Sequence, residues 1–225
     1  MYDFVTGPLL WLSLIIFFVG LILRTVYYIK GLDTFLDRVT YGVNTAYGVK
    51  GAIKSILHWI IPFGSRSWRV KPIFTILVFV FHIGLVITPI FLLAHNLILE
   101  ERWGFRLPTI SDTAADIMTI AVIVSAIFLI IRRIALPEVR ILTSAYDYLI
   151  MLITVAPFIT GFISFHQVSD YQFWVILHIL CGEIMLIAIP FTKLSHIVLF
   201  FMSRIQIGMD FGIKRGGMKG GGKTW

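Results

Sequence analysis

Five long apolar segments alternate with shorter polar stretches along the chain. A helix needs about 20 predominantly apolar residues to cross a bilayer, and each segment is close to or above that length. The pattern therefore predicts five membrane-spanning helices, and the last segment is long enough to tilt or to project past the membrane. The segments cover residues 9–29, 73–99, 114–131, 141–165 and 173–201.

The polar stretches between these segments differ in charge. Lys and Arg gather in the first and third connections and in the C-terminal region, whereas the second and fourth connections are neutral or acidic. Because positive residues mark the cytoplasmic side of a membrane protein, we expect the N-terminus outside and the C-terminus inside. The expected parts are a first transmembrane helix (1–30), a cytoplasmic loop (31–71), a four-helix core (72–202) and a Gly/Lys-rich cytoplasmic tail (203–225).

Composition supports an all-α membrane protein. Hydrophobic residues make up 58% of the 225 residues and charged residues 14%, and the mean hydropathy is +0.92, outside the range of soluble domains. The net charge of +7 lies in alternate connections, so it indicates topology rather than nucleic-acid binding. The single cysteine, Cys181, excludes an internal disulfide, a cysteine-bound iron–sulfur cluster and covalent c-type haem. Residues 1–8 lack the basic region of a signal peptide, so we expect the first segment to be retained.

The first cytoplasmic loop contains a second kind of pattern. Apolar residues recur at helical spacing on one face over 49–61, and Lys50, Lys54 and His58 occupy another face. This pattern predicts an amphipathic helix that ends at Pro62 and lies on the inner leaflet. Two roles remain open for it, anchoring or docking of a cytoplasmic partner. The apolar residues are Val49, Ile53, Ile56, Leu57, Ile60 and Ile61.

The tail contains a motif that we discount. Residues 217–224 satisfy the P-loop pattern, but a phosphate cradle needs a strand before the motif and a helix after it. The chain ends one residue later, at Trp225. Nucleotide binding is therefore not expected.

Four histidines lie inside the second and fifth apolar segments. Ionisable groups within a membrane are rare and usually functional, and a neutral imidazole is a good haem ligand. Because the two helices should run in opposite directions, we expect His95 to pair with His178 towards the outside, and His82 with His196 towards the inside. Zinc is a poorer interpretation, because each level offers two ligands and lacks a third.

The spacing of these histidines tests the pairing. His178 and His196 are 18 residues apart, which returns to the same face of an ideal helix after a rise of about 27 Å. His82 and His95 are 13 apart, which rotates them by roughly 140°. We expect Pro89, between them, to kink the helix and to bring both rings towards the partner helix.

Other groups near the four histidines are candidates for supporting roles. Glu183 is predicted to relay protons to a quinone, with a structural hydrogen bond as the alternative. Basic residues near the inner ends are predicted to pair with haem propionates, although the arginines also serve as topology signals; they are Lys193, Arg132 and Arg133. Two glycines are expected to relieve crowding beside a macrocycle, Gly84 and Gly182. The remaining histidines are expected to be ordinary surface residues, His58 and His166.

Three stretches resemble a known family. They read Pro-Phe-Thr-Lys-Leu-Ser-His-Ile at 190–197, Arg-Arg-Ile-Ala-Leu-Pro-Glu-Val-Arg at 132–140 and Phe-His-Ile-Gly at 81–84. Over about residues 72–202 the chain resembles the gamma subunit of respiratory nitrate reductase, a five-helix dihaem cytochrome b. Where those subunits carry a lysine associated with quinol, this chain has Asp112 and Asp116.

Further stretches carry a closer likeness. They are His-Asn-Leu-Ile-Leu-Glu-Glu-Arg at 95–102, Phe-Phe-Met-Ser-Arg at 200–204, Gly-Met-Asp at 208–210 and Thr-Gly-Pro at 6–8. These resemble the nitrate-reductase-gamma-like subunits of two redox complexes of sulfate reducers, the high-molecular-weight cytochrome c complex (Hmc) and its relative Tmc. This likeness covers nearly the whole chain.

The resemblance implies a specific function. It implies a five-helix bundle with two stacked haems b, held by His82, His95, His178 and His196, in the inner membrane of the cell. Electrons would pass between a periplasmic multihaem cytochrome c or menaquinone and a cytoplasmic iron–sulfur subunit related to heterodisulfide reductase, within a complex containing other membrane subunits. Two alternatives remain open, a haem-free structural anchor and a small proton-coupled transporter.

Overall fold

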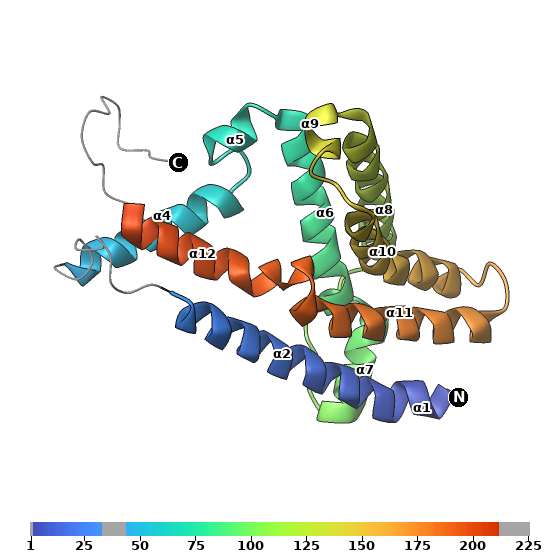
Figure 1. Cartoon of the computed structure of the whole chain (residues 1–225). Coiled ribbons are helices and arrows are strands. Elements are labelled where there is room, and N and C mark those ends of the chain that lie inside the picture. Colours follow the sequence, from blue (N-terminus) through green and yellow to red (C-terminus); the bar gives the residue numbers. More distant parts are fainter. Residues whose placement is uncertain (1, 33–43, 212–225) are drawn as a thin grey trace. The chain divides into compact units, whose positions relative to one another are not determined.

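The computed structural model describes residues 2–32 and 44–211, and every regular element in these ranges is a helix (Figure 1). Five of these helices are long and apolar enough to cross a membrane. The prediction of a multi-pass, all-helical membrane protein is thereby confirmed, whereas the orientation of its termini stays a prediction. The five spans are Tyr2–Lys30 (α1, η1 and α2), Pro72–Phe91 (α6), Asp112–Ala135 (α8), Ala145–Phe165 (α10) and Tyr171–Phe191 (α11).

Polar residues at the ends of the apolar segments set where two spans begin. Helix α8 starts after Ser111, whose hydroxyl accepts a hydrogen bond from the backbone N–H of Ala114 at 3.3 Å. Helix α10 starts after Ser144, whose backbone N–H donates to the carboxylate of Asp147 at 2.9 Å. Such caps satisfy donors that a helix start leaves unpaired.

The second apolar segment is two helices rather than one. Helix α6 ends at Phe91 and α7 runs over Leu93–Trp103, because Leu92 is extended with φ −66° and ψ 133°. Instead of the expected kink at Pro89, the structure has a helix end: α6 stops two residues after this proline, and a new helix begins beyond Leu92. Proline removes one backbone hydrogen bond from the last turn, which weakens it. The rotation calculated between His82 and His95 on one helix no longer applies.

The fifth apolar segment is also interrupted. Helix α11 ends at Phe191, a short 3₁₀ turn η2 covers Lys193–Ser195, and α12 runs over His196–Phe211. Thr192 is extended, and its hydroxyl accepts from the backbone N–H of Leu194 at 3.2 Å. The expectation that His178 and His196 share one face of one helix is therefore wrong. Helix α12 includes residues 203–211, which were assigned to the tail, and the P-loop-like residues 217–224 lie outside the described residues.

The amphipathic helix of the first loop is confirmed as α4, Thr45–Ile60, which ends before Pro62. Its start is capped by Asn44, whose side chain accepts from the backbone N–H of Tyr47 at 3.2 Å. A further short helix that the sequence pattern did not indicate, α5, covers Arg66–Arg69. Its start is capped by Ser65, whose hydroxyl accepts a hydrogen bond from the backbone N–H of Trp68 at 3.3 Å.

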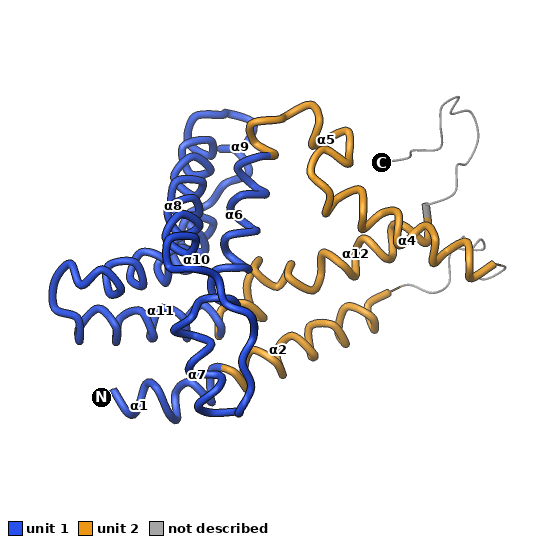
Figure 2. Tube along the Cα trace, turned by 180° about the vertical axis from the view of Figure 1, so that it is seen from behind, with its two compact units in different colours: residues 1–13, 76–186 blue, residues 14–75, 187–225 orange. Residues whose placement is uncertain are grey.

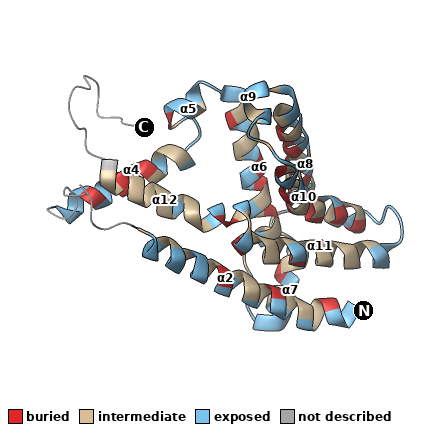
Figure 3. Ribbon diagram, viewed as in Figure 1, coloured by how far each residue is buried: buried red, intermediate tan, exposed pale blue. Residues whose placement is uncertain are grey.

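The chain divides into two compact units (Figure 2), which we describe separately. Unit 1 comprises residues 1–13 and 76–186. Its buried core includes Val122 and Ala126 of α8 and Phe158 of α10. Buried positions on these two helices are red in Figure 3. A Cβ atom at Gly84 of α6 would lie 2.5 Å from Cγ2 of Val122, so this glycine permits close packing of α6 on α8. The expected role of Gly84 beside a macrocycle stays a prediction.

Unit 2 comprises residues 14–75 and 187–225. Helices α4 and α12 pack closely within it, and a Cβ at Gly208 would lie 2.5 Å from the Cα of Ala52. Farther along, a Cβ at Gly20 of α2 (Leu10–Lys30) would lie 2.6 Å from Cβ of Pro190. Glycine thus lets helix backbones approach at two places in this unit.

Candidate functional site

Two of the four candidate histidines lie side by side in unit 1. The ring centroids of His95, on α7, and His178, on α11, are 5.9 Å apart, and the ring planes differ by 11°. The sequence predicted this pair from the opposite directions of the two segments. The structure therefore brings together two imidazoles that lie 83 positions apart in the sequence.

The break between α6 and α7 orients His95. A helix end leaves backbone carbonyls without intrahelical partners. One of them, the carbonyl of Pro89, accepts from Nδ1 of His95 at 2.8 Å. A second, the carbonyl of Ile90, accepts from the side-chain amide of Asn96 at 2.8 Å. The interruption that invalidated the helical-wheel calculation is thus the feature that holds the His95 ring.

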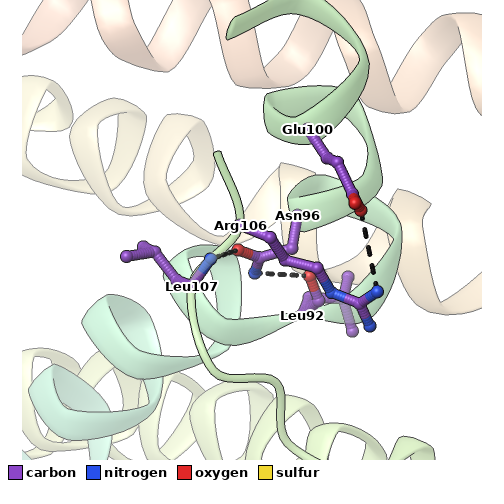
Figure 4. Close-up of polar contacts among 5 residues, drawn as sticks. All are labelled: Leu92, Asn96, Glu100, Arg106 and Leu107. Carbon is purple, nitrogen blue, oxygen red and sulfur yellow. Dashed lines mark hydrogen bonds and ion pairs between the residues drawn. The ribbon is translucent and has the colours of Figure 1, made fainter. Parts of the chain in front are cut away.

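The side chain of Asn96 connects the break between α6 and α7 to the connection that follows α7 (Figure 4). Its side chain is fully buried, donates to the carbonyl of Leu92 at 3.0 Å and accepts from the backbone N–H of Leu107 at 3.0 Å. An ion pair between Glu100 and Arg106, 3.6 Å apart and largely exposed, joins the same two stretches. Because every polar group of Asn96 is satisfied, the turn that carries His95 has a single well-defined geometry.

Helix α10 provides the seat for His178. Nδ1 of His178 donates to the carbonyl of Pro157 at 2.8 Å. One turn along α10, a Cβ at Gly161 would lie 2.9 Å from both Cε1 and Nδ1 of the same ring. Only a glycine leaves room for the imidazole at this position. Pro157 and Gly161 together fix where the ring lies against α10.

These contacts assign the protons on both rings. A carbonyl oxygen only accepts hydrogen bonds, so Nδ1 is the protonated nitrogen in the neutral form of His95 and of His178. Nε2 is then the nitrogen with a free lone pair. Histidines that bind metals almost always donate their other ring N–H in this way, which fixes the tautomer and the ring orientation.

The structure does not test the predicted pairing of the other two candidates, His82 and His196. Nδ1 of His82 lies 2.7 Å from the carbonyl of Val78, and Nδ1 of His196 lies 2.8 Å from the carbonyl of Lys193. His82 belongs to unit 1 and His196 to unit 2, so their pairing stays a prediction. His58 on α4 makes the same kind of bond to its own helix, so this bond alone does not mark a ligand.

Glu183 lies in the same helix as His178 and is 3% exposed. Neither carboxyl oxygen has a hydrogen-bond partner among the described residues, so the structural hydrogen bond considered for it is absent there. Beside it, a Cβ at Gly182 would meet nothing within 4 Å. An unpaired carboxyl group inside a membrane span is costly and usually functional.

The structure does not test the basic residues that were predicted to pair with haem propionates. Arg133 donates to the hydroxyl of Thr143 at 3.3 Å, and Lys193 is exposed. The propionate roles of Arg132, Arg133 and Lys193 all stay predictions. His166 is exposed, as expected of a surface residue, and its Nε2 lies 3.1 Å from Oδ1 of Asp116.

Sequence reasoning missed three residues that position the histidine pair. Pro157, Gly161 and Asn96 act on the pair through backbone geometry and buried polar contacts. A proline followed four residues later by a glycine inside a span was the available signal for α10. A buried asparagine next to His95 was the signal for α7, since a polar side chain in an apolar segment needs partners.

Comparison with known proteins supplies a relative. A protein of Nitratidesulfovibrio vulgaris (strain Hildenborough) is 55% identical over 217 residues, which cover 96% of each chain. The chain belongs to the same family as this protein. The name of the Nitratidesulfovibrio protein, "Protein", states no activity. No protein-family model and no solved structure matches the chain. Because the match with the Nitratidesulfovibrio protein covers nearly both chains, the family shares the multi-span architecture, while activity has to be argued from the site.

Proposed function

We propose that the chain is a dihaem cytochrome b, the membrane subunit of a respiratory redox complex. The observation that carries the proposal is the His95–His178 pair, with near-parallel rings and both Nδ1 atoms bound to backbone carbonyls. The resemblance to nitrate-reductase-gamma-like subunits supports it. The second haem, at His82 and His196, rests on the sequence argument.

The separation of the rings fits one metal ion held between them. A metal–imidazole nitrogen bond is about 2.0 Å long, so an ion bonded to both rings would keep the ring centroids within about 6 Å of each other. The observed separation is 5.9 Å. Zinc sites take three or four protein ligands, and the described residues contain no group of three or more His, Cys, Asp or Glu suited to a metal ion. Haem iron needs only axial ligands from the protein.

The residues divide the work of holding such a group. His95 and His178 would bind such a group through Nε2, while Pro89, Pro157 and Gly161 fix the positions of the two rings. The apolar spans exclude water and lower the local dielectric, which tunes the potential of a bound iron. Haem, when bound, supplies reversible one-electron chemistry, and the protein contributes position and environment.

The resemblance supplies the proposed partners. The chain would connect a periplasmic multihaem cytochrome c or menaquinone with a cytoplasmic iron–sulfur subunit in the inner membrane. Glu183 is the candidate proton carrier for a quinone, because it is buried, has no hydrogen-bond partner among the described residues and lies in the same span as His178. A quinone gains protons when it gains electrons, so a site for it needs such a group.

The test is a pyridine haemochrome assay on the purified full-length protein. We expect two haems b per chain in the wild type and one in each of H95A and H178A. H58A is the matched control, because His58 makes the same Nδ1–carbonyl bond outside the candidate site. It should retain two haems.

Absence of haem from the wild type would overturn the proposal and favour the structural anchor. Retention of two haems in both H95A and H178A would show that this pair is not a ligand pair. A haem-free protein that moved protons in vesicles, with loss of transport in E183Q, would favour the transporter.

A further inference from the structure

Helix α4 has three distinct faces. Gly48, Gly51, Ala52 and Ser55 are buried, Lys50 and Lys54 are exposed, and a row of aliphatic residues is exposed as well. That row consists of Val49, Ile53, Leu57 and Ile60, which are 43–52% exposed. An exposed aliphatic row of this kind needs an occupant.

The small-residue face already has its partner. A Cβ at Gly208 of α12 would lie 2.5 Å from the carbonyl oxygen of Gly51 and from the Cα of Ala52. The two backbones are therefore in contact, and α4 cannot rotate its aliphatic face inward against α12 without losing this packing. The aliphatic face is thus left for something other than α12.

Two sets of hydrogen bonds, here called tethers, connect the α4–α12 pair to the ends of membrane spans. One set involves α2 and the other α6. The hydroxyl of Tyr28, near the end of α2, donates to the side chain of Gln206 on α12 at 2.5 Å. At the other tether, Thr75 in the first turns of α6 donates to the carbonyl of Trp68 at 2.8 Å, and the indole of Trp68 donates to the carbonyl of Trp59 on α4 at 3.2 Å. All five residues belong to unit 2, so these contacts fix α4 near the level where two spans leave the bilayer.

The second tether has the composition of a membrane interface. Trp59 and Trp68 meet edge to face with centroids 5.5 Å apart, and Trp68 lies 6.2 Å from Phe74 of α6. The guanidinium of Arg204 lies 4.9 Å from the Trp59 ring, a cation–π contact. Burial lowers the pKa of Arg204, and nearby Tyr28 raises it in part, but arginine stays charged at neutral pH. Tryptophan and basic residues together are typical of the boundary between headgroups and acyl chains.

We propose that α4 lies in the headgroup region of the leaflet on the Lys/Arg-rich side, with its aliphatic face against acyl chains and Lys50 and Lys54 at anionic headgroups. Charge favours a lipid surface, since both exposed lysines flank the aliphatic row and anionic lipids attract such lysines. The position of α4 along the membrane normal favours a lipid surface too, because the two tethers hold α4 near the ends of α2 and α6. The proposal does not depend on haem.

The test uses the full-length protein in nanodiscs of phosphatidylcholine and phosphatidylglycerol, in a C181S background. Ile53→Cys reports on the aliphatic face, and Lys50→Cys is the matched control on the same helix. We expect the thiol of I53C to react about tenfold more slowly than the thiol of K50C with a water-soluble maleimide, as burial of one aliphatic side chain implies. A fluorophore on position 53 should be quenched by doxyl-labelled lipid, and one on position 50 by iodide.

Two results would overturn the proposal. Equal reactivity at positions 53 and 50 would place the aliphatic face in water. Slow reactivity at 53 without quenching by doxyl lipid would mean that protein, from this chain or a partner, covers the face. For the headgroup contact, quenching at 53 should be stronger with phosphatidylglycerol than without it, and K50Q/K54Q should abolish the difference. A wild type insensitive to phosphatidylglycerol would refute that contact.

Discussion

At the scale of single residues, the candidate site depends on small groups that touch the histidine rings. The pairing of His95 with His178 was predictable, because the directions of two spans decide which ends meet. The seat on α10 was not predictable, because nothing in the sequence says that Pro157 and Gly161 face α11 rather than lipid. Such facts depend on the rotation of a span about its own axis, which a uniformly apolar segment leaves unspecified.

Replacement of Gly161 by alanine tests this seat. The added Cβ would lie 2.9 Å from the His178 ring, so the ring must shift and its bond to Pro157 must lengthen. We expect a loss of stability of about 1–3 kcal/mol from overpacking and an altered low-spin signal of one haem in electron paramagnetic resonance, which senses the angle between axial imidazole planes. Gly182→Ala is the control, since its Cβ would meet nothing within 4 Å. Indistinguishable spectra of G161A and wild type would refute the role of Gly161.

Glu183→Gln tests the proton-carrying role at the same scale. The amide preserves the shape of the side chain but cannot exchange a proton, so both haems should remain while reduction by a menaquinol analogue slows by about 10²–10⁴. Stopped-flow measurement of haem reduction gives the rate. E101Q, an exposed glutamate outside the spans, is the control and should react at the wild-type rate. An unchanged rate in E183Q would remove Glu183 from the proposed site.

At the scale of helices, the sequence predicted which segments are helical, but it did not predict where two of these helices are interrupted. Apolar length indicated all five spans, and helical spacing indicated α4. The breaks at Leu92 and Thr192 were missed, because both lie within apolar segments and a proline three or two residues earlier is compatible with a kink or an end. Hydrogen bonds made by the side chains of Asn96 and Thr192 stabilise a helix end, rather than a kink, at these two places.

Asn96→Ala tests whether the break is held by this side chain. The change leaves the carbonyl of Ile90 and the backbone N–H of Leu107 without their present partner. We expect a loss of roughly 1–3 kcal/mol for each buried group left unpaired, and weaker retention of the haem bound by His95. Thermal unfolding followed by haem release measures both. E100Q on the same helix breaks only an exposed ion pair and should cost at most about 1 kcal/mol; equal losses in the two variants would contradict the role of Asn96.

At the scale of the whole molecule, the two histidine pairs differ in what supports them. His95 and His178 lie within unit 1 and have a defined geometry, whereas the pairing of His82 with His196 stays a prediction, because these two residues belong to different units. If the two pairs lie at different depths of the membrane, as proposed, electrons that cross it need both of them.

Proteoliposomes made from quinone-free lipid test this transmembrane path. With ferricyanide trapped inside and a membrane-impermeant reductant outside, wild-type protein should bleach the ferricyanide, and both H178A and H196A should abolish the bleaching while each retains one haem. H58A should behave as wild type. Bleaching that persists in H196A would mean that His196 is not on the path. The His95–His178 pair would then be a site that exchanges electrons with a partner on a single face of the membrane.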